Sequence, residues 1–252
     1  MGFPLEGSHF LVTGGASGIG KGVTSCLIEQ GASVSVVDVD AETGATFVDE
    51  NDAAKSQLRF YECDITDATQ VHTTVCEIIE ELGPLHGLVN SAGIQETTPI
   101  MDIPLEKWQQ HLDVNTTGTF LVTQEVCNHM ITEEIDGTVV NIGSVAASLR
   151  PRPGQGAYAA SKAAMTTFTI VLAQELAEFG INCNVVHPGP IDTPMFRNVE
   201  EKQASEERAT QLLLDRIGRP EDVGYLVTFL LSDMAEWITG QSFTVDGGVV
   251  HR

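Results

Sequence analysis

The chain has 252 residues, a hydrophobic content of 42% and a net charge of −22. This length provides enough apolar material for one large α/β domain. No apolar run approaches the roughly 18 residues that a membrane span needs. The negative charge disfavours nucleic acid and anionic membranes as partners. It arises because basic residues are scarce, 13 against 35 acidic ones, so an ordinary acidic enzyme and a salt-adapted protein both fit the balance.

The cysteines and the amino-terminal sequence indicate a cytoplasmic location. The first ten residues lack the basic and apolar segments of a secretory signal. The five cysteines are odd in number and scattered, with no C-x-x-C pair: Cys26, Cys63, Cys76, Cys127 and Cys183. We therefore expect reduced thiols, and neither a disulfide framework nor a metal site.

Taken in chain order, seven short apolar runs alternate with longer amphipathic stretches. We predict strands at residues 9–13, 33–38, 58–64, 85–90, 137–144, 181–188 and 242–246. We predict helices at residues 18–30, 67–82, 105–131, 155–179 and 220–232. Apolar strands separated by helices predict a parallel sheet covered on both faces, the doubly wound α/β arrangement. No repeat or linker divides the sequence, so residues 1–252 are predicted to form a single domain.

A glycine-rich stretch, TGGASGIG at residues 13–20, follows the first predicted strand and opens the first helix. Glycines permit a tight turn and a close approach of backbone amides to a pyrophosphate, which the helix amino terminus also attracts. The stretch therefore predicts a dinucleotide site that includes Gly14, Ser17, Gly18 and Ile19. A simple strand-to-helix connection is the alternative.

Asp38, at the end of the second predicted strand, indicates which dinucleotide binds. A carboxylate there can accept hydrogen bonds from both hydroxyls of an adenosine ribose and would repel a 2′-phosphate. Neither Ser17 nor Val39 supplies a cation for such a phosphate. The sequence favours NAD over NADP, although an aspartate that only caps a helix fits the same spacing.

Tyr158 and Lys162 stand four residues apart in AYAASK at residues 157–162. Residues at this spacing share one face of a helix. A free tyrosine has a pKa of about 10, and a neighbouring ammonium favours the phenolate and lowers that pKa. The pair can therefore serve proton transfer, and the alternative is a solvated pair on a packing helix.

Residues 189–215 form a long connection between the sixth predicted strand and the last long helix. It opens with GPIDTPM and then becomes charged. Connections of this length in a compact domain are usually functional, so we predict a lid over the substrate. A solvated surface helix is the alternative.

These motifs together resemble the short-chain dehydrogenase/reductase family. TGGASGIG, NSAG at residues 90–93, Asn115, Ser144, YAASK and HPGPIDTP at residues 187–194 occur in the family's order and spacing. Ser91 is a departure from the more frequent NNAG. The resemblance implies a Rossmann fold with a seven-stranded parallel sheet, and a homotetramer or homodimer built on the two long helices.

The resemblance also implies the roles of individual residues. Tyr158 would exchange a proton with the substrate oxygen, and Ser144 would hydrogen-bond that oxygen. Lys162 would bind the nicotinamide ribose, and Asn115 would hold a water that connects Lys162 to solvent. Tyr158 and Lys162 are thus cofactor-binding as well as catalytic, and the other implied cofactor residues are Asp64, Ile65, Asn90, Ala92, Gly93, Pro188, Gly189, Ile191 and Thr193.

The expected function is the NAD-dependent interconversion of a secondary alcohol and its ketone, with a cyclic alcohol or dihydrodiol among the candidate small-molecule substrates. A hydroxysteroid dehydrogenase and a 3-oxoacyl reductase are alternatives within the family. A non-enzymatic NAD(H)-sensing regulator is an alternative of another class, and it would usually lose part of the catalytic set.

The sequence leaves the roles of three further residues open. Arg150 and Arg152 precede Tyr158 in a loop that should rim the substrate pocket, where a guanidinium could grip a carboxylate. Their surroundings resemble 2,3-dihydro-2,3-dihydroxybenzoate dehydrogenases, but loop arginines are also often solvated. His187, directly before PGP, is expected to have a structural role.

Overall fold

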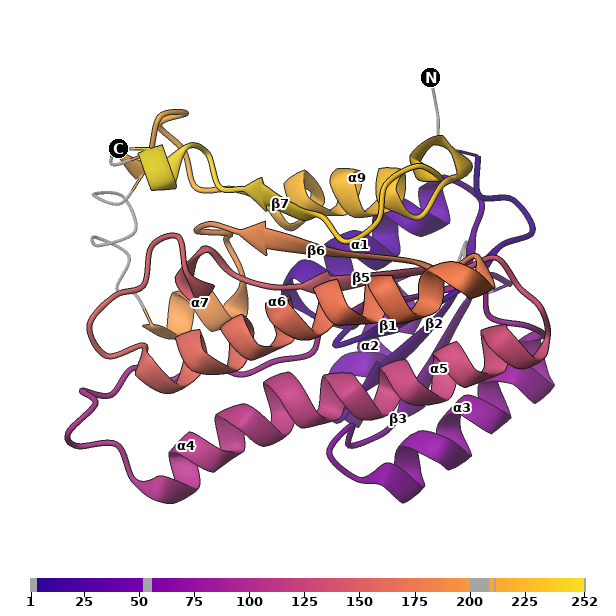
Figure 1. Cartoon of the computed structure of the whole chain (residues 1–252), viewed down its shortest axis with the longest axis horizontal. Helices are drawn as coiled ribbons and strands as arrows, with labels where there is room; N and C mark the ends of the chain where they lie inside the picture. The colour runs from indigo at the N-terminus through magenta and orange to yellow at the C-terminus, as the bar shows by residue number, and fades with distance from the viewer. Residues whose placement is uncertain (1–3, 52–55, 200–208, 211, 252) are drawn as a thin grey trace.

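The computed structural model describes residues 4–51, 56–199, 209–210 and 212–251. Seven parallel strands form one sheet in the order β3-β2-β1-β4-β5-β6-β7 (Figure 1). Their bounds are β1 (His9–Thr13), β2 (Ser33–Asp38), β3 (Leu58–Glu62), β4 (Gly87–Asn90), β5 (Thr138–Ile142), β6 (Asn182–Pro188) and β7 (Ser242–Val245). All seven predicted strands are present, and the sheet confirms the predicted seven-stranded Rossmann fold. Because the strand order reverses between β1 and β4, a crevice is expected at their carboxyl ends.

Helices cover both faces of the sheet, as the alternating pattern predicts (Figure 1). One face carries α1 (Gly18–Glu29), α2 (Ala41–Glu50) and α9 (Pro220–Leu230). The other carries α3 (Ala68–Leu82), α5 (Thr119–Thr132) and α6 (Gly156–Leu176). The helix α4 (Leu105–Leu112) leads into α5, and α7 (Pro194–Val199) follows β6.

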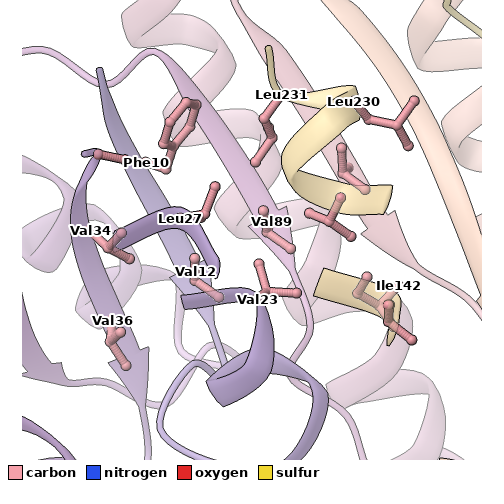
Figure 2. Packing of buried hydrophobic residues seen from close by; sticks show 14 of the residues in the cluster. Phe10, Val12, Val23, Leu27, Val34, Val36, Val89, Ile142, Leu230 and Leu231 are labelled. Atoms are coloured by element: carbon pink, nitrogen blue, oxygen red, sulfur yellow. The ribbon is translucent and has the colours of Figure 1, made fainter. Parts of the chain in front are cut away.

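The alternation of side chains along each strand explains the two cores. In β1, Phe10 and Val12 belong to the cluster beneath α1 and α9, whereas Leu11 belongs to the cluster beneath α3, α5 and α6. Figure 2 shows the first cluster, in which Val23 and Leu27 of α1 lie beside the strands. In the five central strands both faces are buried, so every residue can be apolar, which is why these strands are nearly continuous apolar runs in the sequence. The edge strands β3 and β7 keep exposed residues. Burying each apolar side chain stabilises the fold by about 1.5–3 kcal/mol.

The first and last long helices pack closely because two glycines lie at their contact. A β-carbon on Gly22 of α1 would lie 2.4 Å from Cβ of Pro220, and one on Gly224 of α9 would lie 2.9 Å from the carbonyl oxygen of Gly22. Side chains larger than hydrogen would push the two helices apart.

The helix α2 is not predicted by the sequence pattern. Its buried residues are only Gly44 and Phe47, so the helical period is weak. The carboxylate of Asp40 caps it by accepting a hydrogen bond of 3.0 Å from the amide of Thr43. A β-carbon on Gly44 would lie 2.1 Å from the ring of Phe60, so the glycine that lowers helix propensity lets α2 lie on β3. Contact with the sheet, rather than local preference, therefore stabilises this helix.

The predicted helix at residues 105–131 is interrupted. Between α4 and α5 the chain forms a π-helix, Asp113–Gly118, which inserts a wider turn into an otherwise continuous rod. The predicted helices at residues 155–179 and 220–232 end earlier than expected, at Leu176 and Leu230, and short 3₁₀ turns follow at Ala177–Phe179 and Asp233–Ala235.

The predicted lid at residues 189–215 is described only in part, because residues 200–208 and 211 lie outside the described residues. In the described part, Ile191 bridges to Gly218, α7 was not separately predicted, and Leu212 is buried. The lid therefore stays a prediction.

All five cysteines are free, and Cys76 is the exposed one among them. Within the described ranges, no helix combines the length and the apolarity that crossing a bilayer requires.

Candidate active site

A cleft of about 770 Å³ opens at the carboxyl ends of the central strands. It is lined by the loops that follow β1 to β6, as the reversal of strand order predicts. Of the predicted site residues, those that line it are Gly14, Ser17, Gly18, Ile19, Asp38, Asp64, Ile65, Ala92, Gly93, Ser144, Tyr158, Lys162, Pro188, Gly189, Ile191 and Thr193. Asn90 and Asn115 do not line it. The fold thus brings residues from six loops to one site.

The glycine-rich turn at one side of the cleft fits a dinucleotide. Gly14 has φ of +62°, and a β-carbon there would lie 2.7 Å from Cα of Ala92. No side chain caps α1 at Ser17, so the first amides of the helix remain able to bind an anion. A turn this tight, followed by an uncapped helix, matches what a pyrophosphate needs.

Asp38 lies at the carboxyl end of β2 and is partly buried. Burial raises the pKa of its carboxyl group, while hydrogen bonds from backbone amides, including that of Asp40 at 3.3 Å, oppose the rise. The cations among the described cleft residues are Arg150, Arg152 and Lys162, which all come after β5. In the sheet β2 and β5 are three strand spacings apart, about 14 Å. The end of the cleft at Asp38 therefore carries a carboxylate and no cation among those residues.

Asn90 faces away from the cleft into the layer of helices. Its Nδ2 donates to Oγ1 of Thr123 at 2.9 Å and to Oδ1 of Asn141 at 2.8 Å. Asn141 in turn donates to Oγ1 of Thr169 at 2.8 Å. This buried chain of hydrogen bonds ties β4 and β5 to α5 and α6. The side chain of Asn90 thus links the central strands to the helices, and the cofactor contact that the family resemblance implies for this residue stays a prediction.

Asn115 sits in the π-helix, where its side chain is completely buried. Its Oδ1 accepts from the amide of Ile94 at 2.8 Å, and its Nδ2 donates to the carbonyl of Ile94 at 3.0 Å and to Oγ of Ser161 at 3.0 Å. A β-carbon on Gly93 would lie 3.0 Å from Oδ1 of Asn115 and 3.3 Å from Nζ of Lys162. Asn115 therefore joins the loop after β4 to α6 close to Lys162. Ile94 and Ser161, its partners, were not identified from the sequence.

The side chains of Ser144 and Tyr158 both line the cleft and lie close enough for the serine hydroxyl to influence the tyrosine. The amide of Ala146 donates to Oγ of Ser144 at 3.1 Å, so the serine hydroxyl keeps its own hydrogen for donation into the cleft. Burial raises the pKa of the Tyr158 hydroxyl, and the Ser144 hydroxyl opposes that rise. The tyrosine is therefore protonated near neutral pH in the chain by itself.

Lys162 follows Tyr158 by one turn of α6 and is 5% exposed. Its Nζ donates to the carbonyl oxygen of Ile142 at 2.9 Å. Burial lowers the pKa of Lys162 to about 8. The sequence predicts that this ammonium lowers the pKa of Tyr158, but in the chain by itself burial raises that pKa and the opposing influence is Ser144 rather than Lys162.

His187, at the end of β6, is buried behind Ser144 and does not line the cleft. Its imidazole contacts the backbone of Ser144.

Polar residues that the sequence analysis missed line the substrate side of the cleft. On α4 and the π-helix the spacing of these residues places them on one face: Glu106, Gln109, Gln110 and Asp113. Such a polar face is normally solvated, so only its position beside the cleft identifies it. Gln95 and Gln155 join it from neighbouring loops. Within the described residues, no group of three or more His, Cys, Asp or Glu side chains could hold a metal ion.

Comparison with known proteins identifies the family. Residues 14–250 match the family described as enoyl-(acyl carrier protein) reductase. The chain is also 38% identical to the 3-oxoacyl-(acyl-carrier-protein) reductase of Thermotoga maritima, over 98% of this chain and 99% of that one. The chain belongs to the short-chain dehydrogenase/reductase family. This short-chain dehydrogenase/reductase is therefore an oxidoreductase with a nicotinamide cofactor, which confirms the reaction class expected from its motifs.

Relatives of this short-chain dehydrogenase/reductase differ in the substrates that their names give. The 2,3-dihydro-2,3-dihydroxybenzoate dehydrogenase of Bacillus subtilis is 34% identical, over 97% of this chain and 96% of that one. A blue fluorescent protein from a metagenomic library, solved in complex with NADPH, superposes with a TM-score of 0.88. It is 34% identical, over 97% of this chain and 98% of that one.

Proposed function

We propose that the chain is an NAD-dependent dehydrogenase that interconverts a secondary alcohol and its ketone. The observation that carries this proposal is that Ser144, Tyr158 and Lys162, all buried, line the same cleft as Asp38. A complete catalytic set in a dinucleotide-sized cleft supports an enzyme rather than an NAD(H)-sensing regulator.

The catalytic roles follow from the chemistry of these groups. The substrate oxygen binds between the hydroxyls of Ser144 and Tyr158, each of which can donate a hydrogen bond to it. Tyr158 gives its proton to a ketone oxygen, or takes the proton of an alcohol. When bound, the nicotinamide would exchange the hydride with the substrate carbon. Ser144 stabilises the charge that develops on oxygen, which in such sites contributes roughly 2.7–4 kcal/mol.

Lys162, one helical turn after Tyr158, supports the proton transfer. Its ammonium favours the phenolate that Tyr158 becomes after donating its proton, and the positive nicotinamide ring acts in the same direction. We further propose that Asn115 holds a water that connects Lys162 to solvent, which is consistent with the position of both residues beside Gly93.

The preference for NAD rests on Asp38. A carboxylate at the end of β2 suits the hydroxyls of an adenosine ribose and repels a 2′-phosphate. Because a related structure contains NADPH, family membership does not decide this point, and the residue itself carries the argument. Asp64, Ile65, Ile191 and Thr193 are the proposed adenine and carboxamide contacts.

A cyclic alcohol or dihydrodiol is the substrate that the cleft supports best. The polar side chains of Gln95, Gln110 and Gln155 can bind ring hydroxyls, and the Bacillus subtilis relative is a dihydrodiol dehydrogenase by name. A 3-oxoacyl reductase is the second candidate, because the Thermotoga maritima relative is one.

We propose a cytoplasmic homotetramer or homodimer built on α5 and α6. On these helices Phe120, Ile170 and Val171 are 40–45% exposed, and Phe120 makes an edge-to-face contact with Phe168 at 6.2 Å between ring centroids. An exposed apolar face of this kind fits an interface between copies. Light scattering after gel filtration measures the assembly.

The decisive experiment is a panel of secondary alcohols, dihydrodiols and ketones, including a 3-oxoacyl thioester, assayed with NAD(H) and with NADP(H). We expect turnover of cyclic alcohols with NAD⁺. Better turnover with NADP(H) throughout would contradict the cofactor assignment. Reduction of the thioester alone, with NADPH, would identify the second candidate.

A further inference from the structure

Two arginines line the same cleft as the catalytic residues. Arg150 and Arg152 lie in the loop between β5 and α6, the loop that begins at Ser144 and leads to Tyr158. Lys162 is the third cation among the described cleft residues, and it donates to the carbonyl of Ile142. The reaction proposed above uses Lys162 but assigns no role to either arginine.

The loop that carries the arginines is held in place by backbone hydrogen bonds. The amide of Arg150 donates to the carbonyl of Val145 at 2.7 Å, and the amide of Gln155 donates to the carbonyl of Arg152 at 3.1 Å. The amide of Thr98 donates to the carbonyl of Gly154 at 2.9 Å, which ties the loop to the segment after β4. The guanidinium of Arg150 also donates to the carbonyl of Val249. The guanidinium of Arg150 is therefore positioned before any substrate arrives, which lowers the entropic cost of binding.

The two guanidinium groups are close enough to repel each other. Burial lowers the pKa of Arg152, and the charge of Arg150 lowers it further. An anion that binds at this site is attracted by both positive charges. The carboxylates on the substrate side of the cleft, Glu106 and Asp113, are exposed to solvent on α4 and the π-helix.

The position of the arginines assigns the anion to the substrate. The adenosine end of the cleft lies at β2, about 14 Å across the sheet from β5. A phosphate on that ribose is therefore remote from Arg150 and Arg152. Ser144 and Tyr158, which hold the reacting oxygen, flank the arginines in sequence and line the same cleft.

We infer that Arg150 and Arg152 bind a carboxylate of the substrate, so that the physiological substrate is a hydroxy acid or its oxo acid. This inference rests on the proposed function. A planar guanidinium can donate two parallel hydrogen bonds to a carboxylate, which fixes the orientation of the substrate as well as its affinity. The carboxylate would thereby present the carbinol carbon to Tyr158 in one orientation.

The first test measures binding without turnover. Benzoate and its neutral isostere benzamide are titrated by calorimetry into the protein alone and with each reduced cofactor bound. We expect benzoate to bind at least tenfold more tightly than benzamide. Arg152→Gln should remove that difference and leave benzamide binding and reduced-cofactor binding within twofold. Lys107→Gln, which removes a nearby exposed charge outside the cleft that pairs with Glu96, should change nothing.

The second test compares hydroxycyclohexanecarboxylic acids with their carboxamides as substrates. We expect kcat/KM to favour the acid at least tenfold, and Arg152→Gln to abolish the preference through KM. Equal treatment of acid and amide in both tests would overturn the inference, as would a loss of reduced-cofactor binding in Arg152→Gln. Turnover of neutral alcohols without acid preference would leave the proposed function intact, whereas turnover of no alcohol at all would contradict the proposed function itself.

Discussion

The imidazole of His187 lies against the backbone of Ser144. Its Nδ1 is 3.0 Å from the carbonyl oxygen of Ser144 and 3.2 Å from the amide nitrogen. The ring tautomer decides which of these bonds forms, and either one holds the serine backbone. Burial lowers the pKa of His187, so the ring is neutral near pH 7. A residue at the end of β6 thus fixes the proposed catalytic residue Ser144, which follows β5, without reaching the cleft.

Replacing His187 should therefore impair catalysis through Ser144. His187→Leu keeps the volume of the side chain and removes the hydrogen bond, and we expect kcat to fall about tenfold, or 1.4 kcal/mol. The Kd for NADH should stay within twofold. In a double-mutant cycle, Ser144→Ala with His187→Leu should be no slower than Ser144→Ala alone. Additive losses would show that His187 acts independently of the serine.

Tyr158→Phe removes the proposed proton donor and little else. We expect kcat to fall by about 10²–10⁴-fold or more, the range that general acid–base catalysis contributes. Because the phenyl ring still fills the same buried position, NADH binding measured by fluorescence should remain nearly intact. A variant that keeps most of its turnover would overturn the assignment of Tyr158.

Burial of the Lys162 ammonium is predicted to lower the stability of the folded chain, although the same lysine is proposed to serve catalysis. A pKa lowered from 10.5 to about 8 means that the unfolded chain binds the proton more tightly than the folded chain. The contribution of Lys162 to stability should therefore rise by about 3 kcal/mol as pH increases from 8 towards 10.5. The buried cysteines, whose pKa values are raised, act in the opposite direction, so the lysine's contribution is measured against a variant that lacks it.

The variant Lys162→Met lacks this buried charge. At pH 7 it should unfold at a higher urea concentration than the parent protein, with no turnover, and the difference should shrink as pH rises through that range. A variant that is less stable at every pH would show that the bond from Lys162 to Ile142 outweighs the cost of burying the charge.

Cofactor preference should follow the charge at the end of β2. Val39 is 66% exposed beside Asp38, so an arginine fits there without repacking. Asp38→Ser combined with Val39→Arg should raise the kcat/KM ratio of NADP⁺ to NAD⁺ roughly 100-fold, about 2.7 kcal/mol. Asp40→Ser removes the same charge outside the cleft and should leave the ratio unchanged, and the serine hydroxyl can still cap α2 as Asp40 does. An unchanged ratio in the double variant would remove Asp38 from the cofactor site.

Acid should destabilise the fold through histidines whose pKa values are lowered by burial, among them buried His9 and half-buried His129. His9 bonds to Oγ of Ser35 at 2.8 Å, and His129 accepts from the amide of Leu85 at 3.2 Å. Burial lowers the pKa of both below 6.5. The stability that these neutral rings contribute is present above pH 6.5 and is lost as pH falls through their folded-state pKa values.

Urea unfolding between about pH 7.5 and about pH 5.5 measures this loss. The variant His129→Gln keeps an acceptor for Leu85 but cannot titrate, so its stability should depend less steeply on pH. The capping carboxylates of Asp40 and Asp67, whose pKa values are lowered, titrate below 3.8 and so fall outside this window.

The fold could be predicted from the sequence wherever both faces of an element are buried. Runs such as residues 9–13 are apolar because helices cover the sheet on both sides. The sequence does not reveal α2, whose stability comes from the contact of Gly44 with Phe60. It also does not reveal the π-helix, because the hydrophobic spacing continues across Asp113–Gly118 and only the hydrogen bonds of Asn115 mark the wider turn.

The site could be predicted where a motif sets the backbone conformation. It could be predicted less well where a side chain can point either into the cleft or into the core. Gly14 and Ser144 line the cleft as expected. Asn90 lies in the same motif as Ala92, but strand alternation turns its side chain towards Thr123 and Asn141. The polar face of α4 could not be recognised, because a solvated helix and a substrate-facing one have the same sequence pattern.

The close packing of Gly22 and Gly224 has a consequence for how this protein can change. It joins α1, near the amino terminus, to α9, near the carboxyl terminus, so the two ends of the chain pack together on one face of the sheet. The loop that carries Arg150 and the polar face that carries Gln110 both lie between those ends and outside that contact. Substitutions in that loop or on that polar face can change which substrate binds, while the packing of α1 against α9 and the stability that it provides are unchanged. Substitutions at either glycine should instead reduce stability and affect every substrate alike.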